Sequence, residues 1–113
     1  MSPFDALAEF EKEFKRLFKK YGTLDDDLEK FKKILMITPT GIGKNFVTVY
    51  SSQTVKIVKA RMACRALRDR SLRIVYSYFE QEQLVEFIEL YFKGDKENED
   101  RDRIKEYLSN HQN

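Results

Sequence analysis

The sequence predicts an α+β fold, in which an N-terminal helical hairpin packs on a small antiparallel β-sheet and a short C-terminal helix follows. Three observations lead to this class. Apolar residues first recur at three- and four-residue spacing, then segments rich in β-branched and aromatic residues alternate with polar turns, and a charged segment with few apolar residues comes last. A length of 113 residues with 42% hydrophobic residues favours a single domain, residues 1–113.

The first third of the chain has the pattern of two consecutive helices. Ser2 and Pro3 are typical of a helix start, and an apolar stripe follows as far as Tyr21. Gly22 predicts the end of this helix, and Thr23 with the acids after it predicts the start of a second one. Because the connection is short, we expect the two helices to form an antiparallel hairpin.

Four strands are expected after the loop TPTGIGKN, whose proline and glycines interrupt regular structure. A short polar connection at residues 80–82 favours antiparallel pairing of the last two strands. The charged segment that follows is expected to be a helix anchored by Ile104, Tyr107 and Leu108. The predicted strands are FVTVYSS, TVKIVKARM, LRIVYSYF and QLVEFIELYFK.

Several classes of protein and site are not expected. No apolar run approaches the roughly 18 residues of a membrane-spanning helix, and the single cysteine, Cys64, has no partner for a disulfide within the chain. These features predict a cytoplasmic protein without a membrane segment. Cys64 lacks the neighbouring cysteine or histidine of a zinc or thiol site, and the acids of residues 95–102 alternate with bases. We therefore expect no metal and no cofactor.

The segment Val55–Phe79 is strongly basic, although the whole chain has a formal net charge of only +2. A local positive field of this kind attracts polyanions such as nucleic acids, or an acidic partner protein. The segment contains one acid, Asp69, and seven bases: Lys56, Lys59, Arg61, Arg65, Arg68, Arg70 and Arg73.

The motifs around this segment resemble the RelE/ParE superfamily of bacterial type II toxin–antitoxin toxins. They are FKRLFKKYGTLDDDLEKF, KARMACRAL, LRIVYSYF and IELYFKGDKENED, in that order, and they span nearly the whole chain. The resemblance implies a helical hairpin on a sheet with a basic concave face, and a cognate antitoxin that holds the toxin inactive. RelE-like members cleave mRNA on the ribosome, whereas ParE-like members bind DNA gyrase without chemistry. A repurposed RNA-binding module without activity is a third interpretation.

The resemblance also assigns roles to single residues. Lys59 and Arg61 correspond to the second lysine and the arginine of a Lys-x-Lys-x-Arg run, and Arg73 corresponds to the arginine that contacts the scissile phosphate. Lys93 corresponds to a lysine that closes the penultimate element. Gly94 stands where the nucleases have an arginine, and half of their catalytic pattern is retained.

These residues fit the chemistry of RNA cleavage by its own 2′-hydroxyl, which needs a base, an acid and positive charge near the phosphate. We expect Lys59, among neighbouring cations, to transfer protons, and Arg61 and Arg73 to clamp the phosphate. The candidate catalytic residues are Lys59, Arg61 and Arg73, and the candidate substrate-binding residues are Lys56, Arg65 and Lys93.

Four further residues receive weaker assignments. Lys56 would share the face of Lys59 only if a bulge intervened between them. Tyr107 is a remote candidate for the late active-site tyrosine of the nucleases. Arg68 and Arg70, beside Asp69, are expected to be solvated charges of a turn.

Overall fold

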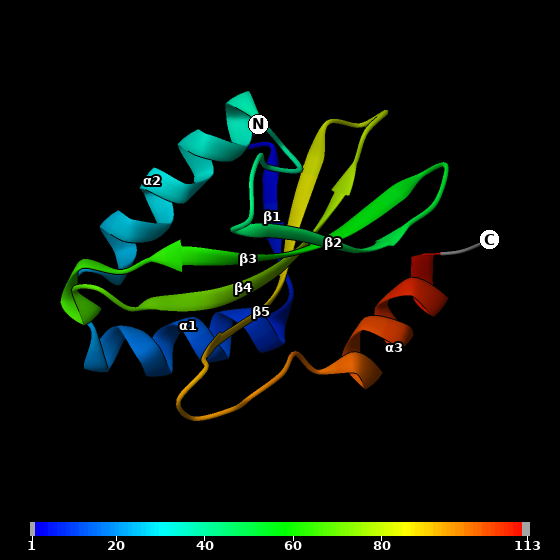
Figure 1. Ribbon diagram of the computed structural model, residues 1–113. Helices are drawn as coiled ribbons and strands as arrows, with labels where there is room; N and C mark the ends of the chain where they lie inside the picture. Colours follow the sequence, from blue (N-terminus) through cyan, green and yellow to red (C-terminus); the bar gives the residue numbers. More distant parts are fainter. Residues whose placement is uncertain (1, 112–113) are drawn as a thin grey trace.

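A computed structural model describes residues 2–111 and shows an α+β fold with a five-stranded sheet (Figure 1). The strands are β1 (Phe4–Ala6), β2 (Phe46–Ser51), β3 (Val55–Ala63), β4 (Ser71–Phe79) and β5 (Leu84–Phe92). The helices are α1 (Ala8–Lys20), α2 (Leu24–Ile37) and α3 (Arg101–His111), and a short 3₁₀ helix, Arg65–Leu67, joins β3 to β4.

The sheet has the strand order β1-β5-β4-β3-β2. Strands β2 to β5 form the four predicted antiparallel strands, each paired with its neighbour in sequence. The fifth strand, β1, pairs in parallel with β5, so the sheet is mixed and the prediction of a purely antiparallel sheet is wrong. The parallel strand closes one edge of the sheet.

The predicted helix start at Ser2 and Pro3 is also wrong, because the chain enters the sheet before it becomes helical. The Val85 N–H donates to the Pro3 carbonyl oxygen at 2.9 Å, and the Phe4 ring stacks on that of Phe87 at a centroid distance of 5.8 Å. Helix α1 begins only at Ala8, after an N-cap, Leu7, that makes no side-chain capping bond. Pairing with β5 therefore overrides the local helix-start signal.

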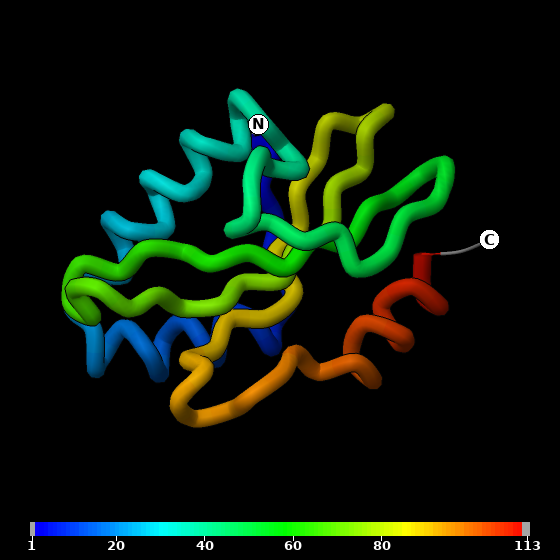
Figure 2. The backbone as a smooth tube through the Cα atoms, viewed as in Figure 1, coloured from blue at the N-terminus to red at the C-terminus, as the bar shows by residue number. Residues whose placement is uncertain are grey.

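Helices α1 and α2 pack on one face of the sheet and enclose the main core (Figures 1 and 2). They follow each other through residues 21–23, as predicted, but they diverge from this turn, so the predicted hairpin is only partly confirmed (Figure 1). Cys64 is buried in this core, where burial raises the pKa of its thiol. Between the helices and the sheet lie Phe10, Leu17, Leu24, Phe31, Val58, Met62, Leu72, Ile74, Tyr76 and Phe87, among others.

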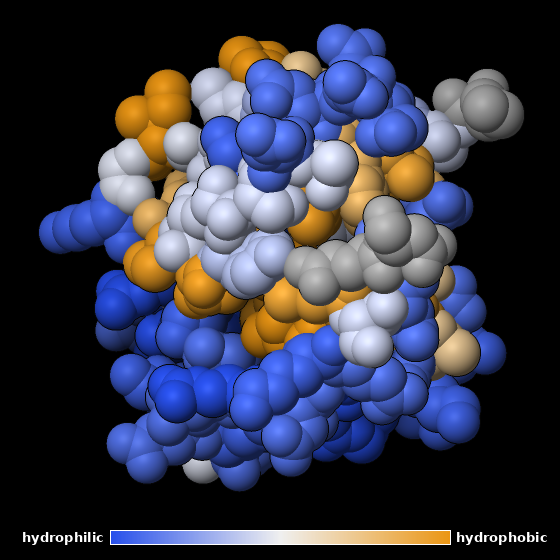
Figure 3. Space-filling view, turned by 90° about the vertical axis from the view of Figure 1, so that its right-hand side faces the viewer, coloured by the Kyte–Doolittle hydropathy of each residue, from blue (hydrophilic) through white to orange (hydrophobic). Residues whose placement is uncertain are grey.

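Helix α3 covers part of the opposite face through a second, smaller core. Its anchors Ile104 and Tyr107 are buried against Ile57, Val75 and Ile88, which confirms the predicted role of these two residues. Figure 3 views the end of the molecule where α3 and the hairpin turns lie, and it shows apolar side chains gathered near the middle of this face, above a largely hydrophilic lower part. The two faces of the sheet are thus covered unequally, and the α3 face leaves room for polar side chains.

Within residues 2–111, no helix is long and apolar enough to cross a membrane. The same residues contain no group of three or more His, Cys, Asp or Glu side chains arranged to hold a metal ion.

Candidate anion-binding site

The basic residues of β3 and β4 lie on the sheet face that carries α3. Alternate residues of a strand point to the same side, so Lys59 and Arg61 share the face of Ile57, which packs in the α3 core. The antiparallel register places Arg73 of β4 opposite Arg61, and Tyr91 of β5 opposite Arg73. Two arginines and a tyrosine therefore form a row across three neighbouring strands.

A surface pocket of about 410 Å³ opens beside this row. Two of its cations are held by local contacts: the Arg73 Nη1 donates to the Ser71 Oγ at 3.0 Å, and the Arg70 guanidinium lies 5.0 Å from the centre of the Phe92 ring. Four bases and a single acid surround the pocket, which gives it a positive potential. The lining residues are Arg61, Asp69, Arg70, Ser71, Arg73, Phe92, Lys93 and Gly94.

The arrangement of Arg61 and Arg73 favours an anion between them. Burial and the charge of Arg61 lower the pKa of Arg73, although a guanidinium stays charged at neutral pH. Like charges directly opposite each other in a sheet repel, and the salt bridges found within residues 2–111 include none to either arginine. Since two guanidinium groups match the oxygens of a phosphate, this pair is suited to bind one.

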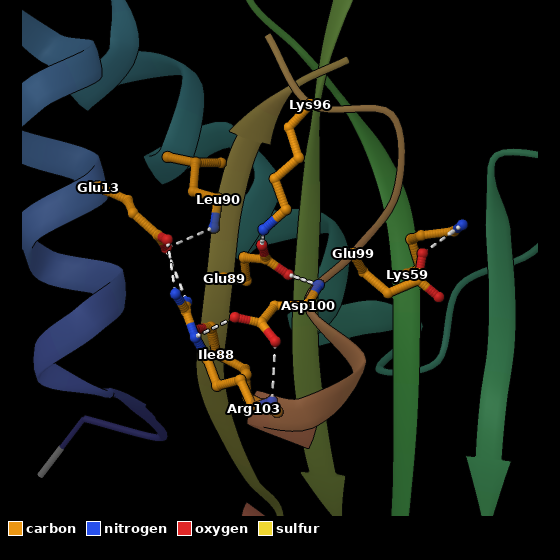
Figure 4. Close-up of polar contacts among 9 residues, drawn as sticks. All are labelled: Glu13, Lys59, Ile88, Glu89, Leu90, Lys96, Glu99, Asp100 and Arg103. Carbon is orange, nitrogen blue, oxygen red and sulfur yellow. Dashed lines mark hydrogen bonds and ion pairs between the residues drawn. The ribbon is translucent and has the colours of Figure 1, made fainter. Parts of the chain in front are cut away.

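Lys59 lies on the same face, but its ammonium group is held by Glu99 (Figure 4). The Lys59 Nζ donates to the Glu99 Oε1 at 2.9 Å, and the two side chains are 28% and 7% exposed. The prediction that Lys59 lies among neighbouring cations is therefore incomplete, because its ammonium group also has an acidic partner. Burial opposes the charge of Glu99, but the hydrogen bond from Lys59 and the charges of Lys59 and Arg101 outweigh it and lower the pKa of Glu99.

Two of the three candidate substrate-binding residues lie away from the pocket. The register between β3 and β4 is unbroken from Val55 to Ala63, so Lys56 points to the opposite face, beside Tyr78 of the main core. No bulge in β3 therefore brings Lys56 round to Lys59. The third candidate, Lys93, lines the pocket.

Arg65 faces the start of α2 instead of the pocket. Its guanidinium lies 3.6 Å from the Asp26 carboxylate and 3.9 Å from that of Asp27, and its backbone N–H donates to the Asp27 Oδ2 at 3.3 Å. These contacts fix the 3₁₀ connection between β3 and β4 against the helix. The predicted substrate-binding role of Arg65 has no geometric support.

Sequence reasoning missed three residues of this face. Arg70, expected to be a solvated turn charge, lines the pocket, and Glu99 binds Lys59 across forty positions of sequence. Tyr91 has no place among the predicted site residues, yet it lies in the arginine row. Burial and the charges of Glu99 and Glu89 raise its pKa to about 12, so it stays protonated. Tyr91 could have been assigned to this face only from the register of β5 against β4, which decides which of its alternating side chains lie beside Arg73.

Tyr107, the remote candidate for an active-site tyrosine, lies elsewhere. Its hydroxyl group is 2.7 Å from the Ser77 Oγ and donates to the Glu86 Oε1 at 2.7 Å, and the residue is 3% exposed. Burial is the main cause of a strongly raised pKa for Tyr107. Its place in this network indicates that Tyr107 fixes α3 to the sheet.

No protein-family model matches the sequence, and a search of curated proteins finds no match. A solved structure is similar in fold: one chain in the crystal structure of the archaeal RelE–RelB complex from Pyrococcus horikoshii OT3. The TM-score is 0.61 and the sequence identity 18%, and the alignment covers 80% of this chain and 93% of that one. The fold is RelE-like. At this identity the likeness concerns the fold, and the residues of the site must be judged by their geometry.

Proposed function

We propose that this chain is a RelE-type toxin that cleaves mRNA on the ribosome, and that Arg61, Arg73 and Lys93 bind the phosphate of the RNA. The observation that carries this proposal is the cross-strand arginine pair, which lines one pocket with Lys93 and has no acidic partner within residues 2–111. The RelE-like fold supports it independently. A ribosomal target also agrees with the expected cytoplasmic location.

The proposed cleavage uses the 2′-hydroxyl of the RNA as the nucleophile. Its oxygen attacks the adjacent phosphorus, a base takes its proton, and the departing 5′-oxygen receives a proton. Negative charge builds on the phosphate oxygens, where the fixed guanidinium groups of Arg61 and Arg73 would stabilise it. Lys59 remains the candidate for proton transfer, and in this role it must first be released from Glu99.

We also propose that an antitoxin binds this chain. The structural neighbour was solved in a complex that is described as RelE–RelB. An acidic and partly apolar segment would complement the basic pocket, whose lining includes the Phe92 ring, and it could fold as it binds. Such a segment would exclude RNA from Arg61 and Arg73 by direct competition.

A second candidate function is a ParE-like toxin that binds DNA gyrase and performs no chemistry. Two observations favour it. Lys59, the candidate for proton transfer, is ion-paired with Glu99. Gly94 stands where the nucleases have an arginine, and an arginine would not fit here without movement of Phe92, because an added Cβ would lie 2.4 Å from its ring. In that case the basic pocket would bind an acidic protein surface.

Brief induction of the protein in growing cells separates these functions. The 5′ ends of cellular mRNAs and the DNA-damage response are measured together, for the wild type and for the Arg73→Ala and Arg68→Ala variants. We expect cuts within translated mRNAs that Arg73→Ala abolishes and Arg68→Ala leaves. DNA-damage signalling with intact messages would establish the gyrase function instead, and RNA binding without either effect would establish the binding module.

A further inference from the structure

The segment between β5 and α3, residues 93–100, lies against the basic face and is named the strap here (Figure 4). It carries Glu99 to Lys59, where the two side chains meet at 2.9 Å. The strap also contains Lys93, which lines the anion pocket. This short segment thus contributes a positively charged side chain to the pocket and a carboxylate partner to the candidate catalytic residue Lys59.

The strap is fixed by contacts that do not involve Glu99. Glu89 of β5 is fully buried, forms a salt bridge with Lys96, and accepts the Asp100 N–H at 2.8 Å (Figure 4). Beyond the strap, Arg103 of α3 donates to both carboxylate oxygens of Glu13, at 3.0 and 2.9 Å. Because these anchors hold the strap at Lys96 and at Asp100, on both sides of Glu99, that residue can be changed without releasing the strap.

The Lys59–Glu99 pair lies next to the anion pocket. Lys59 and Arg61 are alternate residues of β3 on the same face, about 6.6 Å apart along the strand. An RNA phosphate that reached Lys59 would need the place that the Glu99 carboxylate occupies. The Glu99 side chain is 7% exposed, and its nearest cation is Lys59 at 2.9 Å, with Arg101 farther away at 3.9 Å. The two anions would therefore compete for the Lys59 ammonium group.

We propose that Glu99 is a built-in competitor for the RNA phosphate at Lys59, and so limits RNA binding to the Arg61–Arg73–Lys93 pocket until a phosphate displaces it. This inference rests on the proposed function, because it assumes that RNA binds this face. Glu99 acts here through Lys59 and is a positioning residue. In the free protein it keeps Lys59 in place and unavailable to weakly bound anions.

The proposal predicts that Glu99→Gln strengthens RNA binding. In this variant RNA can bind Lys59 without first breaking the Lys59–Glu99 ion pair. An ion pair near the surface contributes up to about 1 kcal/mol, so we expect RNA affinity to rise by up to about fivefold. Lys59 would add one phosphate contact, which makes the slope of log K against log salt steeper by about 0.7 for single-stranded RNA. A residue with a purely structural role would not change this slope.

The experiment measures fluorescence anisotropy of a labelled single-stranded RNA with the full chain, produced by cell-free synthesis, over a range of salt concentrations. Glu97→Gln is the matched control, because Glu97 is an exposed acid of the same strap. Glu99→Asp keeps the charge but shortens the reach to Lys59, so we expect part of the gain. Lys59→Ala and the Lys59→Ala/Glu99→Gln double variant test whether Glu99 acts through Lys59.

We expect Glu99→Gln to bind more tightly than Glu97→Gln, and we expect the gain to vanish in the Lys59→Ala background. Equal effects of the two glutamine variants, a gain that persists without Lys59, or weaker binding by Glu99→Gln would each overturn the proposal. Arg61→Ala separates this result from the proposed function. If Arg61→Ala leaves RNA affinity unchanged, the RNA-binding function fails as well; if it weakens binding, only the role of Glu99 is at issue.

Discussion

Replacement of Arg73 by alanine is the most direct test of the pocket as a catalytic site. Arg73 is held by Ser71 and lies opposite Arg61, so its guanidinium is fixed before substrate binds. A fixed donor aimed at developing negative charge is commonly worth about 100-fold or more in rate. We therefore expect Arg73→Ala to lower mRNA cleavage by at least this factor.

The same substitution should have little effect on stability. It removes the repulsion between Arg61 and Arg73, and a cross-strand pair contributes roughly 0.2–1 kcal/mol of either sign. The lost packing of the arginine side chain acts in the opposite direction. An unchanged melting temperature with a large loss of cleavage would assign Arg73 to function, whereas a large loss of stability would refute this reasoning.

The assay is primer extension on an mRNA in a reconstituted translation mixture, with the rate measured at saturating and at limiting protein. Arg68→Ala is the matched control, because Arg68 is an exposed arginine of the adjacent turn and changes the net charge equally. Arg73→Lys keeps the charge but loses the bidentate geometry, and we expect an intermediate rate. Equal and mild effects at Arg73 and Arg68 would show that the basic strands only attract RNA.

Three further predictions concern single residues. Arg61→Ala should make the salt dependence of RNA binding shallower by about 0.7 in log–log slope, as binding titrations would show. The stability that Glu99 contributes should be present above its ordinary pKa of 4.5 and lost as the pH falls below it, so thermal melts of the wild type and Glu99→Gln should converge in acid. Tyr107→Phe should cost about 1–3 kcal/mol in denaturant unfolding and leave RNA affinity unchanged, because the Tyr107 hydroxyl binds buried Ser77.

The sequence predicted the elements whose signals are local. Strands β2 to β5 were found from their β-branched and aromatic composition, and α3 from its few apolar anchors. Strand β1 was missed, because a three-residue strand has no period of its own and exists only through pairing with β5. Ser2 and Pro3 favour a helix start locally, but the backbone hydrogen bonds with β5 stabilise an extended conformation at these residues instead.

The candidate site was predicted where strand alternation was enough. Lys59 and Arg61 are two residues apart, so the alternation of side chains along a strand predicted that they share a face. The same alternation predicted that Lys56 points to the other face unless a bulge intervenes. The placement of Arg61 opposite Arg73 depends on a register that only the folded sheet shows. The Lys59–Glu99 pair joins residues forty positions apart through a loop of irregular structure, and no local pattern predicts such a contact.

The distribution of charge over the basic segment leaves only one end of it suited to bind a polyanion. Arg65 is paired with acids of α2, Lys56 faces the other side of the sheet, and Lys59 is held by Glu99. Arg61 and Arg73 remain without an acidic partner within residues 2–111, at the end of the face where Lys93 joins them. An incoming polyanion is therefore attracted first to the pocket, because the positive charge of Lys59 is already neutralised by Glu99. Contact with Lys59 must follow, because it requires a phosphate that is held close enough to displace a carboxylate.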